Sequence, residues 1–258
     1  MKIALIGCGA IGATIARAVR DGLVDVSVLW VMDSKEGRAE MVAELVGAKV
    51  AMDIEDVLKS DVELVVEVAS QGAVRLYGME VITSGKGLLV MSVGALADEK
   101  LFGKMVDAAR KNGVKIYVPS GAIGGLDALA SASIGGLTEV TLSTTKPPRS
   151  LGLTHVTEKS VIYEGTASEA VKLYPANINV SAAVSQAGLG FDKTRVKIAV
   201  DPSIENNVHE IDARGRFGKL HLHVENVPSP DNPKTSYLAA LSAIAMLKRI
   251  ASPLEVGN

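Results

Sequence analysis

The stretch Gly7-Cys8-Gly9-Ala10-Ile11-Gly12 decides the fold of this chain. It follows an aliphatic run at residues 2–6 and opens an amphipathic run, and Asp33 stands about 20 residues further on, at the end of the next aliphatic run. A G-x-G-x-x-G match alone is weak, but this placement between a strand pattern and a helix pattern is typical of a dinucleotide-binding turn. The stretch therefore predicts a Rossmann-type unit.

Each position of the turn has a physical role in binding a dinucleotide. Gly7 makes the tight turn, Gly9 lets the backbone approach a pyrophosphate, and Gly12 lets the helix pack closely on the strand. The N–H groups at the helix start, at Ala10 and Ile11, attract the phosphate charge together with the helix dipole. We therefore expect all five residues to bind the cofactor.

Asp33 bears on the choice of cofactor. Its carboxylate can accept hydrogen bonds from ribose hydroxyls and repels a 2′-phosphate, which favours NAD over NADP. Ser34, Lys35 and Arg38 follow closely and can accommodate that phosphate, so use of both cofactors stays open.

Aliphatic and amphipathic runs alternate over residues 1–118, which predicts a doubly wound parallel sheet with helices on both faces. The expected strands are residues 2–6, 26–32, 63–68, 87–92 and 114–118. The expected helices are residues 10–20, 35–46, 74–84 and 98–112.

Longer strand patterns with fewer helices follow, which predicts a second α+β domain with an open, mostly antiparallel or mixed sheet. The expected strands are residues 139–145, 161–164, 195–200, 209–213 and 220–224. The expected helices are residues 126–134, 167–173 and 178–186. The proline-rich segment 228–233 should break the chain, and a final helix at 236–250 should pack against the first domain. We thus expect a dinucleotide-binding domain of residues 1–118 plus 234–258, and a catalytic and dimerisation domain of residues 119–233.

Composition excludes several classes of protein. The 258 residues are 48% hydrophobic and 22% charged, with 27 basic against 29 acidic side chains, so neither a disordered chain nor a general nucleic-acid binder is expected. No apolar stretch is long enough to span a membrane, and no signal peptide is visible. A single cysteine suits a reducing compartment, so we expect a cytoplasmic protein.

The cysteine and histidines narrow the chemistry. Cys8 lies in the fingerprint turn, so dehydrogenases that form a thioester through a second-domain cysteine are excluded. His221 and His223 alternate as on a solvated strand face, and no other ligands accompany them, so no metal is expected. His209 lies in a polar, loop-flanked setting, where it is either a catalytic base active near neutral pH or a structural histidine at a strand end.

Polar clusters mark the second domain. The turn at residues 120–125 offers backbone N–H groups for a carboxylate or an amide, and the turn at 144–149 places two cations together. In the segment 174–180, Asn177 is the natural N-cap of the next helix, which leaves Asn179 for another role. Taken singly, each cluster also fits a helix cap or a solvated turn.

Five second-domain strings together resemble the L-aspartate dehydrogenase family, and with the front turn the resemblance covers essentially the whole chain. They are PSGAIGGLDAL (119–129), TLSTTKPPRSL (141–151), YEGTASEAVKLYPANINVSAA (163–183), HEIDARGRFG (209–218) and ENVPSPDNPKTSYLAALSA (225–243). The resemblance implies a two-domain, homoserine-dehydrogenase-like fold and a homodimer. It also implies NAD(P)-dependent oxidation of L-aspartate to iminoaspartate, which gives oxaloacetate and ammonia and feeds de novo NAD biosynthesis.

The resemblance also assigns residues. It implies that His209 is the active-site residue and that Ala122 and Asn179 contact the nicotinamide side of the cofactor. The two substrate carboxylates need cations, for which the chain offers Lys146, Arg149 and Lys234. The alternatives are another two-domain oxidoreductase, similar to homoserine dehydrogenase or dihydrodipicolinate reductase, and a non-catalytic NAD sensor.

Overall fold

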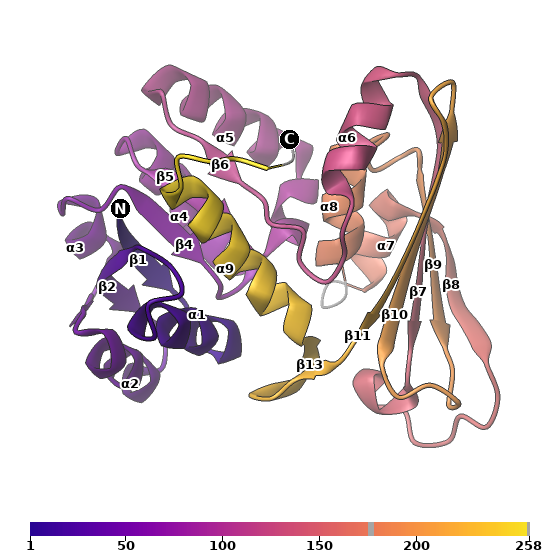
Figure 1. Ribbon diagram of the computed structural model, residues 1–258, viewed down its shortest axis with the longest axis horizontal. Coiled ribbons are helices and arrows are strands. Elements are labelled where there is room, and N and C mark those ends of the chain that lie inside the picture. The colour runs from indigo at the N-terminus through magenta and orange to yellow at the C-terminus, as the bar shows by residue number, and fades with distance from the viewer. Residues whose placement is uncertain (175–177, 257–258) are drawn as a thin grey trace. The chain divides into compact units, whose positions relative to one another are not determined.

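The chain forms two compact units, which Figure 1 colours by residue number. The computed structural model describes residues 1–174 and 178–256, without the side chains of residues 233 and 234. The first unit consists of Met1–Pro119 and Ala240–Val256, and the second begins at Ser120 and ends at Ala239. Each unit has its own sheet and its own buried core.

The first unit is built on six parallel strands. In chain order they are β1 (Lys2–Ile6), β2 (Ser27–Met32), β3 (Lys49–Val50), β4 (Leu64–Glu67), β5 (Gly87–Val90) and β6 (Ile116–Tyr117). Their order across the sheet is β3-β2-β1-β4-β5-β6, so the chain reverses its direction of winding between β1 and β4. This is the strand order of a Rossmann fold, which confirms the predicted class.

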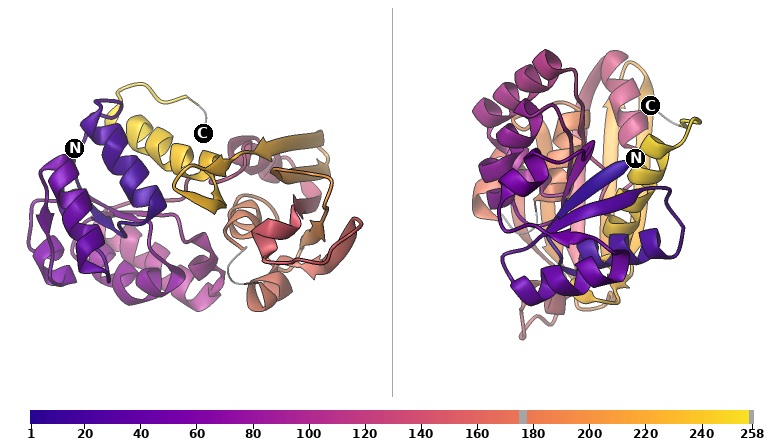
Figure 2. Two further views of the ribbon diagram at one scale, coloured as in Figure 1. Left: turned by 90° about the horizontal axis from the view of Figure 1, so that it is seen from below. Right: turned by 90° about the vertical axis from the view of Figure 1, so that its left-hand side faces the viewer.

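Helices cover both faces of this sheet (Figures 1 and 2). They are α1 (Ala10–Arg20), α2 (Glu36–Val46), α3 (Ile54–Leu58), α4 (Gln71–Thr83) and α5 (Glu99–Asn112), with a short 3₁₀ helix, η1 (Val93–Ala97). β4 and β5 are buried along their whole length because helices lie on both sides, which explains their unbroken aliphatic sequence. The short β3 and α3 were not predicted, because so few residues show no periodicity.

The second unit holds a mixed sheet of five strands, as predicted. The strands are β7 (Leu137–Lys146), β8 (Ser160–Thr166), β9 (Thr194–Val200), β10 (Asn207–Gly215) and β11 (Gly218–Asn226), arranged in the order β11-β10-β7-β9-β8. Only β7 and β9 run parallel, and the other neighbours are antiparallel. The helices α6 (Leu126–Ile134), α7 (Ala167–Leu173) and α8 (Asn179–Ala187) lie on one face, and Figure 1 shows the other face bare of helices. A 3₁₀ turn, η2 (Pro148–Leu151), follows β7.

The inner face of this sheet changes from apolar to polar along β7 and β10. Val140, Leu142 and Ile211 join the core beneath α6 and α8. Thr144 and His209, the next inward positions on the same strands, are also buried but polar. A polar end on an otherwise apolar face is a strong indication of a functional site, because burying polar groups costs free energy unless they are paired.

The proline-rich segment 228–233 is more regular than predicted. It forms the paired strands β12 (Pro228–Ser229) and β13 (Asn232–Ser236), which lead into α9 (Tyr237–Ala251). Proline is tolerated here because a two-stranded ribbon consists only of edge strands. In the described residues, no helix combines the length and the apolar character that a membrane crossing requires.

Candidate active site

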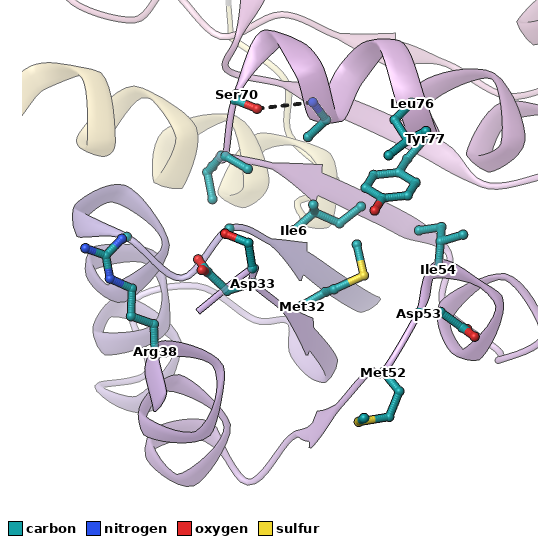
Figure 3. Close-up of a pocket in the computed structure, with 16 residues that line it drawn as sticks. Ile6, Met32, Asp33, Arg38, Met52, Asp53, Ile54, Ser70, Leu76 and Tyr77 are labelled. Carbon is teal, nitrogen blue, oxygen red and sulfur yellow. Dashed lines mark hydrogen bonds between the residues drawn. The ribbon is translucent and has the colours of Figure 1, made fainter. Parts of the chain in front are cut away.

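A pocket of about 610 Å³ opens in the first unit at the carboxyl ends of β1, β2 and β4 (Figure 3). It therefore lies beside the point between β1 and β4 where the strand order reverses, which is where open α/β sheets bind their ligands. The fingerprint turn, Asp33 and Ser70 all line it.

The glycines of the turn meet the requirements that the sequence set. Gly7 has a φ of +106°, and a Cβ there would lie 2.7 Å from the carbonyl of Val68. A Cβ on Gly12 would lie 2.2 Å from the oxygen of Gly7. At Gly9 nothing lies within 4 Å of a Cβ, so space is open above the start of α1, where no side chain caps the helix. Open space over uncapped N–H groups fits a pyrophosphate.

Asp33 does more than sequence reasoning assigned to it. Oδ2 accepts the backbone N–H of Cys8 at 2.7 Å, and Oδ1 accepts the N–H of Lys35 at 2.8 Å. The carboxylate thus holds the fingerprint turn to the end of β2. Its remaining lone pairs can accept hydrogen bonds from ribose hydroxyls. Arg38 lines the same pocket, and Figure 3 shows its guanidinium on the Asp33 side. Burial raises the pKa of the Cys8 thiol to about 12, so this sulfur is unreactive at neutral pH.

The opposite side of the pocket is mostly apolar, apart from Asp53, and was missed by sequence reasoning. Met52, Ile54, Leu76 and Tyr77 line it, and Met52 and Leu76 are 86% and 61% exposed. Exposed apolar side chains around a pocket suit a flat aromatic ring such as adenine. No sequence signal identified them, because they come from the unpredicted β3–α3 segment and from the first turns of α4.

Glu67 was also missed. It ends β4, is only 2% exposed, and accepts four hydrogen bonds from two loops. Oε1 accepts the N–H groups of Ala69 and Ser70, and Ser92 donates both its hydroxyl and its N–H. Burial raises the pKa of this carboxyl. Glu67 therefore joins the loop after β4, which lines the pocket, to the loop after β5. The available signal was a carboxylate closing an aliphatic run.

In the second unit, His209 lies at the polar end of the inner sheet face. It is 5% exposed, and Nδ1 lies 2.9 Å from Oγ1 of Thr144, its partner in the β10–β7 register. Burial, and secondarily the charge of Lys146, lower the pKa of His209 to about 3. The ordinary pKa of histidine, near neutral pH, does not apply to this ring. The structure shows a ring that is neutral at pH 7 in the free chain.

Lys146 is the last residue of β7, and its side chain is also buried. Burial lowers its pKa to about 8, because the charged form loses its hydration. At neutral pH most of these ammonium groups carry a charge in a poorly hydrated place, close enough to His209 to lower its pKa. An anionic ligand would relieve both effects.

Two buried amides complete this polar end. Asn226 donates Nδ2 to the carbonyl oxygen of Ala122 at 2.9 Å, which holds the loop before α6. Asn207 lies opposite Asn226 in the β10–β11 register. The Oδ1 atoms of both residues find no hydrogen-bond donor in the described part of the chain. An unsatisfied buried acceptor costs about 1–3 kcal/mol.

The other predicted residues are less closely tied to His209. Arg149 is exposed, and its Nη2 donates to the carbonyl oxygen of Glu205 at 2.6 Å. Asn179 is the first residue of α8. Asn177, the predicted N-cap, and the side chain of Lys234 lie outside the described residues.

His221 and His223 lie on the solvated face of β11, as predicted. Their Nδ1 atoms lie 2.9 Å from Asp212 and 3.3 Å from Glu210, and both rings are about half exposed.

A Rossmann unit with this pocket, joined to an α+β unit with a buried polar cluster, defines a two-domain NAD(P)-dependent dehydrogenase. Residues 7–119 match the family model "Homoserine dehydrogenase, NAD binding domain", and residues 127–250 match "Aspartate dehydrogenase, C-terminal". The chain belongs to the L-aspartate dehydrogenase family.

Relatives and a solved structure agree along the full chain. An L-aspartate dehydrogenase of Methanosarcina acetivorans is 47% identical, with all of both chains covered, and one of Methanocaldococcus jannaschii is 42% identical with the same coverage. The crystal structure of aspartate dehydrogenase from Thermotoga maritima gives a TM-score of 0.83 at 29% identity, covering 100% of this chain and 99% of that one.

Proposed function

We propose that this chain catalyses the NAD(P)-dependent oxidation of L-aspartate to iminoaspartate, which water converts to oxaloacetate and ammonia. The observation that carries the proposal is the buried pair of His209 and Lys146 in a chain whose full length matches L-aspartate dehydrogenases. This reaction needs a cation that binds a substrate carboxylate and, beside it, an imidazole that transfers protons.

The cofactor residues act by binding and orientation. The turn from Gly7 to Gly12, with the N–H groups of Ala10 and Ile11, binds the pyrophosphate, and Asp33 accepts the ribose hydroxyls. Ala122 and Asn179 are proposed as contacts of the nicotinamide end, on the family resemblance. When bound, NAD(P) supplies the hydride acceptor for the substrate Cα.

Lys146 is the cation that we assign to a substrate carboxylate, because its ammonium is buried beside His209. Arg149 and Lys234 are candidates for the second carboxylate. A bound carboxylate offsets the Lys146 charge and favours protonation of the nearby ring. The pKa of His209 therefore rises from about 3 when substrate binds, which favours the ring as a proton acceptor, while burial remains the larger cause that lowers it.

His209 takes a proton through Nε2, because Nδ1 already contacts Thr144. In the forward direction the ring takes a proton from the substrate ammonium and releases it to solvent. It then takes a proton from the water that attacks the imine and gives that proton to the departing nitrogen, so ammonia leaves and the ring is neutral again. In the reverse direction His209 returns protons as ammonia adds to oxaloacetate.

A substrate comparison tests this function. We expect NAD(P)H to form with L-aspartate, and to be consumed with oxaloacetate plus ammonia, but not to form with homoserine. Turnover of homoserine alone would favour the homoserine-dehydrogenase-like alternative. Binding of NAD(P)H without turnover of either amino acid would favour a non-catalytic sensor.

The finer assignments are part of the same proposal. The chain acts as a homodimer in the cytoplasm, and its iminoaspartate feeds de novo NAD biosynthesis. The family resemblance supports these points, and the open face of the second-unit sheet leaves room for the dimer contact.

A further inference from the structure

The two buried amides beside His209 are the feature that the proposed function leaves unexplained. Asn207 and Asn226 are 6% and 3% exposed, and they face each other across β10 and β11. We call them the amide pair. Each places an Oδ1 atom where no donor among the described residues reaches it. Buried acceptors in native structures nearly always have a partner, so the missing partner points to a ligand.

The orientation of Asn226 is set by its surroundings. Its Nδ2 donates to the carbonyl oxygen of Ala122, which has no hydrogen to give, so the amide cannot be turned to place Nδ2 elsewhere without losing that bond. Oδ1 therefore presents lone pairs. Asn207 stands on the same inner face as His209, two residues before it on β10. The amide pair thus borders the catalytic imidazole.

The chemistry of the substrate identifies the partner. Ionised carboxylates only accept hydrogen bonds, so they cannot satisfy an amide oxygen. They are drawn to Lys146, on the neighbouring β7. The substrate group that donates is the α-amino group, which carries three N–H bonds when protonated and is released as ammonia after oxidation. Two buried acceptors in the same polar cluster as a buried cation match a zwitterion with separated charges.

We propose that the amide pair recognises the substrate nitrogen: Oδ1 of Asn207 and Oδ1 of Asn226 accept hydrogen bonds from the α-amino group of aspartate and, in the reverse direction, from ammonia. This inference rests on the proposed function. It makes Asn207 and Asn226 specificity-determining residues that select an amino dicarboxylate over a plain dicarboxylate.

The decisive variant is Asn207→Leu, which keeps the side-chain size and removes the acceptor. Asn206→Leu is the matched control, since Asn206 is the preceding residue and its amide instead donates to Glu225 at 3.0 Å on the solvated side. Affinities of the NADH-bound protein for L-aspartate and for succinate, the same dicarboxylate without the amine, are measured by calorimetry. We expect Asn207→Leu to weaken the binding of aspartate by about 10- to 100-fold, because a hydrogen bond to a charged group is lost. The affinity for succinate should stay within about twofold of the parental value.

Steady-state kinetics in the reverse direction gives a second readout. Asn207→Leu should raise the KM for ammonia by a similar factor and leave the KM for oxaloacetate unchanged. Its midpoint of urea unfolding should equal or exceed that of the parent, because an unsatisfied buried oxygen is replaced by an apolar group. Asn226→Leu should show the same ammonia effect with an added loss of stability, because the loop at Ala122 is released.

The outcomes separate the two proposals. If the parent forms no NAD(P)H with aspartate, the proposed function fails, and the inference falls with it. If the parent is active but Asn207→Leu keeps the parental ratio of aspartate to succinate affinity, the inference alone is overturned, and buried water is the partner of the amide pair. Equal weakening of aspartate and succinate also overturns it, because that result indicates a general loss of the site.

Discussion

Nδ1 of His209 and Oγ1 of Thr144 lie 2.9 Å apart, although 65 residues separate them in the chain. The contact follows from the antiparallel register of β10 and β7, which places the two residues opposite each other on the inner face. A hydroxyl can donate or accept, so Thr144 holds the ring in place whichever nitrogen carries the proton. The orientation of the imidazole is therefore set by the sheet.

Replacing His209 with alanine should lower kcat by about 10²–10⁴, the usual contribution of general acid–base catalysis. Affinity for NAD should change little, because the fingerprint turn and Asp33 belong to the other unit. Kinetics with aspartate, combined with NAD titration and circular dichroism, checks this. A folded variant with nearly parental kcat would make His209 a structural residue.

Thr144 should act as a positioning residue. In Thr144→Val the shape is kept and the hydrogen bond to Nδ1 is lost, so we expect kcat to fall by about 10-fold, corresponding to about 1.4 kcal/mol, with KM nearly unchanged. Thr144→Ser keeps the hydroxyl and should restore most of the rate. If the valine and serine variants lose the same activity, packing and not the hydrogen bond explains the effect.

The pKa of Lys146 predicts a pH dependence of anion binding. Since burial lowers this pKa to about 8, the ammonium is charged below pH 8 and loses its proton above it. The inhibition constant of succinate should change little between about pH 7 and pH 8 and rise by up to tenfold per pH unit above pH 8. Succinate is used because it lacks an amine that would titrate in the same range.

Lys146→Arg serves as the control, because a guanidinium stays charged throughout this range. Its inhibition constant should show no break near pH 8, whatever its absolute value. A break that persists unchanged in the arginine variant would assign the titration to another group.

Asp33 and Arg38 should set cofactor preference in opposite directions. Asp33→Ala should weaken the binding of NAD more than the binding of NADP, by about 1.5–3 kcal/mol, since a hydrogen bond to a charged group is lost. It should also weaken both cofactors somewhat, because the N–H of Cys8 loses its partner. Arg38→Ala should weaken the binding of NADP and leave the binding of NAD unchanged. Fluorescence titrations of NADH and NADPH measure both, and an unchanged ratio in Asp33→Ala would remove Asp33 as the ribose ligand.

The second-unit sheet should form the dimer contact. Its outer face carries the exposed pairs His221–Asp212 and His223–Glu210 and has no helix over it. Light scattering at micromolar concentration should report twice the mass of the 26.9 kDa chain. A monomer at that concentration would contradict this expectation.

The sequence by itself predicted the local structure of this protein. Helices α1, α6 and α7 begin and end where the pattern of residues predicted, and the glycines of the turn are required by contacts within one strand–helix unit and its neighbour. The alternation of strand and helix patterns in the first unit, and the strand patterns with few helices between them in the second, also predicted which sheet would be parallel and which mixed. These properties depend on residues that are close in the chain, so composition and spacing suffice to predict them.

Only the tertiary structure decided the state of the functional groups. The hydrogen bonds of Asp33 to Cys8 and of Glu67 to Ser92 each span 25 residues, and that of Thr144 to His209 spans 65. Burial of His209 beside Lys146 moved both pKa values far from their ordinary range. The amide oxygens of Asn207 and Asn226, opposite each other in the β10–β11 register, are buried without a donor among the described residues. A sequence names its ionisable and polar groups, but their solvation depends on which distant strands lie beside them, and that is settled only when the chain has folded.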